Sequence, residues 1–325
     1  MKKSKTKTKS KKKKKFQYFF LFILFLGSFF YTCITLSLKM SNEEFVRYLL
    51  MKEDHSVISF YVSKVWDSFF KKGFSLNLKN PFQIFKGNYS YQDYSSNDGD
   101  SEVEPTDSTY VSDPYPEKEV SLPKVYLYNT HQLEEYSSKN VAQYNVTPNV
   151  MMLSYILREK LNDRGIPTIA EENNVSEFLK TNNWNYASSY KVTRLLLEDA
   201  KEKNPSLEYF IDLHRDSVKR SISTTTINGK NYAKILFLIG LEHENYPKNL
   251  EFTEKLNAMF NKYYPGLSRG IYKKQGKGVN GIYNQDFSPQ TILIEVGGME
   301  NTIDEVFSTA EAIADILNKY MEGIE

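Results

Sequence analysis

A long uncharged stretch near the amino terminus constrains the organisation of this chain more than any other feature. Residues 1–15 are rich in lysine, and residues 16–38 (FQYFFLFILFLGSFFYTCITLSL) contain no charged side chain. At about 1.5 Å rise per residue, a helix over this stretch reaches roughly 34 Å, enough to cross a hydrocarbon core of about 30 Å. No small-residue cleavage site follows it, so an uncleaved signal anchor is expected. The lysine-rich tail then lies in the cytoplasm, and the rest of this single-pass chain lies outside the cell membrane.

The charge of the chain is divided unevenly between this tail and the remainder. The net charge is +2, but residues 1–38 hold ten Lys and no acid, which leaves −8 for residues 39–325. A basic tail can also attract nucleic acid or anionic lipid. The acidic remainder, however, excludes the class of basic nucleic-acid-binding proteins. A single Cys excludes a disulfide framework and any Cys-based zinc or iron–sulfur site.

Three segments follow the anchor. Residues 39–87 mix charged and apolar side chains at three- and four-residue spacing, which predicts a helical stalk outside the membrane. Residues 88–123 hold nine acids and one base among Ser, Pro and Gly, so this part is expected to be a disordered, extended linker. Residues 124–325 are then the globular domain.

The globular segment alternates short apolar runs with helical patterns. Strands are expected at residues 124–128, 167–170, 209–213, 233–239 and 290–294. Helices are expected from Thr147-Pro148 to Gly165, from Ser188, from Pro247 to Pro265-Gly266, and after a capping box of Thr302 and Glu305. This order predicts an α/β fold, a mostly parallel sheet with helices on both faces.

Metal-ligating side chains follow the ends of the predicted strands. His131 and Glu134 come after the first strand, and His214 comes after the strand at 209–213. Because parallel sheets place their chemistry beyond the carboxyl ends of the strands, these groups are expected to meet. Two His and one Glu form an established zinc set, which leaves a position open for water. Glu171 and Glu172, after the second strand, remain rival candidates for the third ligand.

Glu295 ends the last strand and is the carboxylate left over. A zinc-activated water still needs a base to take its proton, and the protonated acid can pass it to the leaving amine. We therefore expect Glu295 to be the catalytic base, beside the backbone N–H groups of Gly297-Gly298. The alternative is that both histidines are structural and that Glu295 caps a helix or pairs with a base.

Four motifs in order also resemble the stage II sporulation protein P family. They are YNTHQLEEY at 128–136, IDLHRDS at 211–217, YNQD at 283–286 and ILIEVGGMENT at 292–302. The likeness covers nearly all of residues 124–325. The resemblance implies a Zn²⁺-dependent N-acetylmuramoyl-L-alanine amidase that acts on peptidoglycan in sporulation. It also implies endopeptidase activity in some members, and stage II sporulation proteins D and M as partners.

The resemblance extends to single residues. It assigns His131 and His214 to the metal, Glu295 to catalysis and Glu134, less firmly, to the metal. Many members carry a second His where this chain has Asn129, so Asn129 is expected to orient His131 or the substrate. The remaining polar residues of the motifs are candidates for substrate contact or for holding a ligand: Arg215, Asp216, Asn284, Gln285, Asp286 and Asn301.

Two other functions stay open. A zinc carboxypeptidase can also use His-x-x-Glu with a distant His, and a wall-binding scaffold whose site has decayed would account for Asn129. His243 and His55 are expected to be solvated rather than ligands. The glycine-rich run at 275–281 lacks the G-x-x-x-x-G-K-[ST] pattern, so it indicates a flexible rim rather than a phosphate loop.

Overall fold

The computed structural model describes residues 17–29, 31, 38–53, 110–116 and 118–324. The chain divides into two compact units, of which the second comprises residues 41–50 and 98–325. Residues 17–29 of the first unit are helical. Among the described residues, no helix combines the length and the apolar character needed to cross a membrane. Part of the expected anchor, most of the expected stalk with His55, and residues 88–109 of the expected linker lie outside the described residues.

A mixed six-stranded sheet forms the centre of the second unit, in the order β2-β1-β3-β8-β6-β7. Strands β2, β1, β3 and β8 are parallel, whereas β6 runs antiparallel to β8 and pairs in parallel with β7. The strands of the sheet are β1 (Val125–Tyr128), β2 (Thr168–Ala170), β3 (Tyr209–Asp216), β6 (Ile235–Gly240), β7 (Ser268–Lys274) and β8 (Thr291–Gly298). The mostly parallel α/β sheet predicted from the sequence is therefore confirmed, except that β6 and β7, at one side, run opposite to the other four strands.

The sequence pattern missed three strands. A hairpin of β4 (Thr224–Ile227) and β5 (Lys230–Ala233) stands apart from the main sheet. The third is β7, an edge strand whose sequence SRGIYKK has no apolar run. Its residues are half-buried or exposed, so the hydrophobic pattern that marks a central strand is missing.

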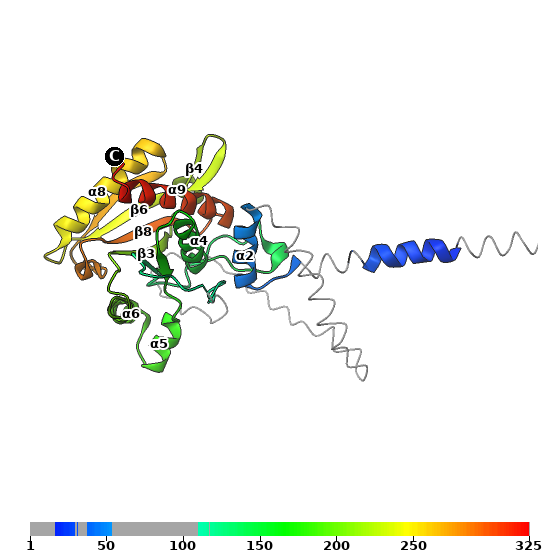
Figure 1. Cartoon of the computed structure of the whole chain (residues 1–325), viewed down its shortest axis with the longest axis horizontal. Coiled ribbons are helices and arrows are strands. Elements are labelled where there is room, and N and C mark those ends of the chain that lie inside the picture. The colour runs from blue at the N-terminus through cyan, green and yellow to red at the C-terminus, as the bar shows by residue number, and fades with distance from the viewer. Residues whose placement is uncertain (1–16, 30, 32–37, 54–109, 117, 325) are drawn as a thin grey trace, which may run out of the picture. The chain divides into compact units, whose positions relative to one another are not determined.

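Helices cover both faces of the sheet (Figure 1). On one face α6 (Ser189–Lys203) packs its Leu197 against Tyr126, Tyr128 and Phe210 of the sheet. On the other side α4 (Val150–Asn162) and α8 (Tyr246–Tyr263) both contact α9 (Ile303–Met321). The shorter helices are α5 (Val175–Thr181), α7 (Arg220–Ser223) and the 3₁₀ turns η3 (Ala142–Tyr144), η4 (Tyr186–Ser188) and η5 (Gln285–Phe287).

The starts of α9 and α4 are capped by side chains, and the predicted start of α4 needs a correction. The capping box of α9 is present, because Thr302 and Glu305 each accept a hydrogen bond from the backbone N–H of the other. The start of α4 was predicted at Thr147-Pro148, but Asn149 is the N-cap and accepts from the N–H groups of Met151 and Met152. The carbonyl of Pro148 instead accepts the N–H of Tyr136, which holds the preceding residues outside the helix.

The end of the expected acidic linker differs from the extended tether that its charge predicts. Val111 is fully buried, and its carbonyl accepts the hydroxyl of Tyr155 at 3.1 Å. Asp113 pairs with Arg158, whose Nη2 lies 2.7 Å from its Oδ1. Residues 110–116 and 118–123 therefore belong to the globular unit, because Val111 and Asp113 find partners on α4.

The first helix of the same unit comes from the expected stalk. Helix α2 (Asn42–Glu53) buries Phe45, Val46 and Leu49. The ring of Phe45 lies 5.4 Å from that of Tyr144, and the side chain of Asn42 accepts the N–H of Thr147 at 3.1 Å. The globular unit thus includes residues 41–50. It begins well before Lys124, where the sequence predicted its first residue.

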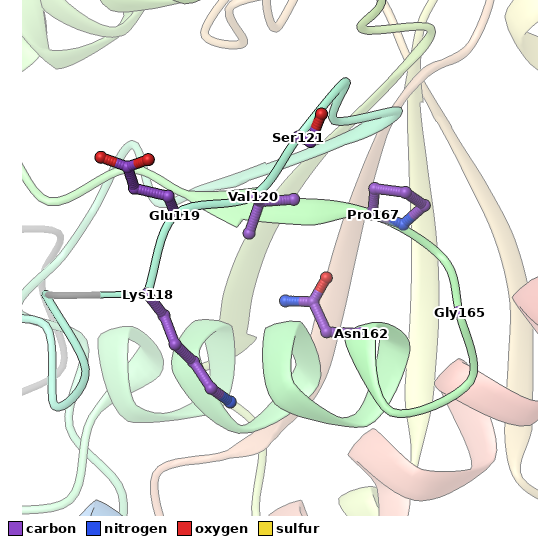
Figure 2. A pocket seen from close by; sticks show the side chains of 7 residues that line it. All are labelled: Lys118, Glu119, Val120, Ser121, Asn162, Gly165 and Pro167. Carbon is purple, nitrogen blue, oxygen red and sulfur yellow. The ribbon is translucent and has the colours of Figure 1, made fainter.

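A pocket of about 330 Å³ lies between residues 118–121 and the end of α4 (Figure 2). Its lining residues include Lys118, Val120, Asn162 and Pro167. The carbonyl of Pro167, just before β2, accepts the backbone N–H of Lys124, just before β1. The pocket therefore lies at the amino ends of β1 and β2. None of the side chains predicted for the catalytic site lines it.

Candidate metal and catalytic site

Three side chains with metal-ligating atoms meet beyond β1 and within β3. His131, Glu134 and His214 each offer a ligand atom, and these atoms all lie within 4.8 Å of one another. His214 is nearly fully buried, whereas the side chains of His131 and Glu134 are 25% and 18% exposed. The cluster is thus open on one side, as a metal that binds a substrate requires.

The spacing inside the cluster fits a metal ion. Nδ1 of His131 lies 3.5 Å from Oε1 of Glu134, and Nδ1 of His214 lies 3.5 Å from Oε2 of the same carboxylate. Two ligands that each stand about 2.1 Å from a tetrahedral zinc ion are about 3.4 Å apart. The two distances end on different oxygens of the Glu134 carboxylate; each is long for a hydrogen bond and close to one edge of a tetrahedral ligand set. The residues present therefore fit zinc.

The loop after β1 is fixed from both sides, which positions His131 and Glu134. The backbone N–H of Thr130 donates to Asp212 at 2.9 Å, and the side chain of Gln132 bonds to the backbone of Asn173 and Val175. Oε2 of Glu134 accepts the backbone N–H of Arg215 at 2.8 Å. The carboxylate is thereby held beside both imidazoles by main-chain atoms of β3.

The charges of the cluster stabilise one another. Burial alone raises the pKa of Glu134, but His214 and His131 outweigh it and hold that pKa well below its usual range. Burial lowers the pKa of His214, yet Asp212 and Glu134 together raise it well above its usual range. The carboxylate thus stays ionised, which is the state that binds a cation, whereas His214 keeps a second proton that a bound cation would have to displace.

Glu295 lies on the same face of the sheet. It is the direct partner of His214 in the β3–β8 register, so both side chains point to one side. Burial raises the pKa of Glu295 to about 7, against a smaller lowering by His214, and its Oε2 has no hydrogen-bond partner among the described residues. A carboxyl with this pKa can both take and return a proton near neutral pH.

The backbone N–H groups next to Glu295 are not available to a substrate, contrary to the expectation. The N–H of Gly297 donates to the carbonyl of Lys234 at 2.8 Å, and that of Gly298 donates to Oδ1 of Asn301 at 2.8 Å. These bonds fix the end of β8 instead.

An aromatic wall completes the site. The ring of Tyr186 stacks on His131 with a centroid separation of 4.9 Å, and Tyr190 meets the same imidazole edge-on at 5.7 Å. Tyr283 packs edge-on against Tyr190 at 5.6 Å. These rings reduce the exposure of the histidines to water, which strengthens electrostatic interactions in the cluster.

The residues predicted to support the ligands take other partners. Nδ2 of Asn129 donates to the carbonyl of Leu213 at 2.6 Å, and its Oδ1 accepts the hydroxyl of Ser154. Asn129 therefore ties the loop to β3, next to His214, rather than orienting His131. Nε of Arg215 donates to the carbonyl of Glu135. Asp216 pairs with Arg269 at 2.7 Å and holds neither histidine.

The polar residues before and after β8 are likewise held inside the fold. Gln285 is fully buried and bonds to the backbone of Leu238 and Gly240. Asp286 pairs with Arg194 at 2.9 Å. Asn284 donates to Thr193, and Asn301 to Thr224 and Glu305. These four residues thus bond to other segments of the fold around β8, and the side chain of Asp286 stays partly exposed.

The rival and doubtful ligands lie outside the cluster. Glu171 accepts the hydroxyl of Tyr126 and the N–H of Asn173 at 2.7 Å. Glu172 is exposed. His243 follows β6, whose antiparallel direction carries it away from the carboxyl ends of β1 and β3. Within the described part of the chain, no further group of His, Cys, Asp or Glu has metal-site spacing.

Sequence reasoning missed Asp212 and the two tyrosines beside His131, Tyr186 and Tyr190. Asp212 precedes His214 by two residues, so strand alternation places both on one face, and this signal was present in the sequence. Tyr190 lies on α6 and reaches the site only through the packing of that helix, so no local pattern marked it.

A sequence profile of the stage II sporulation protein P family matches residues 50–318. The chain belongs to this family. Among curated proteins, stage II sporulation protein P of Bacillus subtilis is 33% identical over 202 residues, which cover 60% of this chain and 50% of the relative. The match thus spans half the length of that relative.

Two solved structures show weaker likeness. The CwlD amidase of Clostridioides difficile, solved in complex with the GerS lipoprotein, is 14% identical, with a TM-score of 0.39 over 61% of this chain and 99% of that one. Cwp6 from Clostridium difficile is 11% identical, with a TM-score of 0.37 over 61% of this chain and 29% of that one.

Proposed function

We propose that this chain is a peptidoglycan hydrolase that uses zinc to cleave the amide bond between N-acetylmuramic acid and L-alanine during sporulation. The observation that carries the proposal is the cluster of His131, Glu134 and His214, with the buried carboxyl of Glu295 on the same sheet face. Family membership adds the cell-wall setting. The lysine-rich tail and the uncharged stretch at 16–38 support an anchor in the cell membrane, with the hydrolase outside.

The mechanism assigns one role to each group. His131, Glu134 and His214 would hold the ion, which supplies a Lewis acid for the scissile carbonyl and a lowered pKa for water. Glu295 takes a proton from the attacking water as the water oxygen bonds to the carbonyl carbon. The same carboxyl then gives that proton to the amide nitrogen as the C–N bond breaks. The products are a lactyl carboxylate on the glycan and a stem peptide with a free amine.

The partners are part of the proposal. Peptidoglycan is the substrate, and stage II sporulation proteins D and M are the proposed assembly partners on the grounds of family resemblance. Tyr186 and Tyr190 cover part of His131, and the rest of its side chain stays exposed. This supports a substrate that reaches the cluster through the exposed side of His131.

Digestion of purified peptidoglycan by the full chain in detergent tests the function. An amidase releases whole stem peptides and stops when a chelator removes the metal. Mass spectrometry that shows single amino acids instead would point to a carboxypeptidase, and no products despite bound zinc would point to a scaffold.

The Glu295→Gln variant tests the assigned base. We expect it to keep zinc but to lose at least 100-fold in hydrolysis, because ligation survives while proton transfer does not. Glu300→Gln, an exposed acid after the same strand, is the matched control and is expected to keep full activity. Wild-type activity in Glu295→Gln would remove Glu295 from the mechanism.

A further inference from the structure

A fully buried carboxylate lies behind the His214 imidazole. Oδ1 of Asp212 is 3.0 Å from Nε2 of His214, on the side of the ring away from Glu134. The N–H of this nitrogen does not point straight at the oxygen, so the contact is mainly electrostatic. Nothing in the described part of the chain other than Asp212 faces this nitrogen as an acceptor.

The contact selects one form of the neutral imidazole. If the proton is on Nε2, a partial positive charge faces the Asp212 carboxylate. If the proton is on Nδ1, the lone pair of Nε2 faces a carboxylate oxygen at 3.0 Å in a buried setting, which is repulsive. The Nε2–H form leaves the lone pair on Nδ1, the nitrogen that lies 3.5 Å from Glu134 in the ligand cluster. A cation held in that cluster would offset the repulsion between this lone pair and the Glu134 carboxylate.

Asp212 is itself held by a chain of buried hydrogen bonds. Its Oδ2 accepts the hydroxyl of Thr130 at 2.6 Å, and Thr130 contacts the hydroxyl of Thr193 at 3.0 Å. Thr193 on α6 also accepts Nδ2 of Asn284 at 3.1 Å. This series of hydrogen bonds thus connects the loop of His131, the strand of His214 and the helix that carries Tyr190. A buried carboxylate with this many donors stays fixed in place.

We propose that Asp212 is a positioning residue that keeps the proton of His214 on Nε2, so that Nδ1 faces the metal. Thr130, Thr193 and Asn284 hold its carboxylate in that place. The inference rests on the metal site of the proposed function, but not on the bond that the enzyme cleaves. It also gives Asn284 a role, although this residue faces the fold rather than the substrate.

The first test is made on the full chain in detergent with zinc bound, a state in which His214 is neutral and carries one ring proton. Histidine labelled with ¹⁵N gives few signals, because the chain contains four His, and the two ring nitrogens report the tautomer. We expect wild-type His214 to carry its proton on Nε2. Asp212→Ala is expected to lose this preference, whereas Asp212→Asn keeps much of it, because an amide oxygen can still accept.

The second test measures zinc affinity by competition with a chromogenic chelator. Asp212→Ala is expected to bind zinc about 10- to 100-fold more weakly, as found when such supporting groups are removed. Thr193→Val keeps the shape of the side chain but removes the hydroxyl that hydrogen-bonds to Thr130 and Asn284. Its zinc affinity should fall about 10-fold or less. Asp216→Asn is the control: it removes a carboxyl two residues after His214 that pairs with Arg269, and should leave both readouts unchanged.

The outcomes separate this inference from the proposed function. Unchanged tautomer and zinc affinity in a folded Asp212→Ala variant would overturn it. If that variant does not fold, Asp212→Asn and Thr193→Val decide, and wild-type values in both would overturn it equally. If the variants shift tautomer and affinity while the wild type releases no stem peptides, the inference stands and the amidase assignment fails.

Discussion

Replacement of Phe45 by Ala tests whether α2 belongs to the catalytic unit. Phe45 is 1% exposed and packs 5.4 Å from Tyr144, beside the fully buried Val46. Truncation of a buried Phe to Ala typically costs about 3–5 kcal/mol. A helix as short as α2 is marginal by itself, so α2 is expected to detach before the whole unit unfolds. We therefore expect the docking free energy of α2 to fall by about 3 kcal/mol, the low end of that range.

Amide hydrogen exchange of the full chain measures this loss. A change of about 3 kcal/mol corresponds to roughly 100-fold faster exchange of the α2 amides, because each 1.4 kcal/mol is tenfold. The β3 and β8 amides are expected to keep their rates. Lys52→Ala, an exposed position on the same helix, is the control and should exchange like the wild type. Equal α2 rates in Phe45→Ala and the wild type would refute the docking that the contacts indicate.

Two further predictions concern β8. The pKa of Glu295, raised by burial from 4.5 to about 7 in the metal-free protein, means that stability falls as pH rises through this interval. Glu295→Gln should therefore raise the melting temperature at pH 8 but not at pH 4, and an equal effect at both would contradict a buried acid. Gly298→Ala places a Cβ 2.4 Å from the carbonyl of Val218. Such overpacking should cost about 1–3 kcal/mol in urea unfolding, and an unchanged midpoint would contradict the close approach.

The cluster of His131, Glu134 and His214 could be predicted because its evidence is local and repeated. His131, His214 and Glu295 each follow or end an apolar run, and parallel strands bring such ends to one edge. The structure places β1, β3 and β8 side by side in that order. Neighbouring strands in register need no knowledge of side-chain packing, so these residues were within reach of the sequence.

The supporting contacts could not be predicted in the same way. Asn129, Asp216 and Gln285 were predicted to contact substrate or to hold a ligand, but their hydrogen-bond partners come from distant segments. Asn129 meets Ser154 on α4, and Asp216 meets Arg269 on β7, a strand that the pattern did not reveal. The sequence thus predicts roughly where a polar side chain next to a motif lies. It does not predict the hydrogen-bond partner of that side chain, because the partner depends on tertiary packing.

The limits of the globular unit were set wrongly by composition. Residues 110–123 are acidic and rich in turn-forming residues, which favours an open linker. The carbonyl of Val111 nevertheless accepts the hydroxyl of Tyr155 on α4, and Asp113 accepts from the guanidinium of Arg158 on the same helix. A few specific contacts offset the ordering entropy that average composition predicts to dominate. A fragment that begins at Lys124 would therefore lose these contacts together with those of Phe45.

Strand direction decides which polar residues can join the site. Hydrophobic periodicity is the same in both directions, so the antiparallel course of β6 was not visible in its sequence. Had β6 run parallel to β8, its carboxyl end at Gly240 would bring His243 to the edge that holds His131. The antiparallel register instead pairs Ile235, the start of β6, with Val296 near the end of β8. His243 therefore lies at the opposite edge, and the ligand set is confined to the His131 loop and β3, with Glu295 of β8 as the remaining acid.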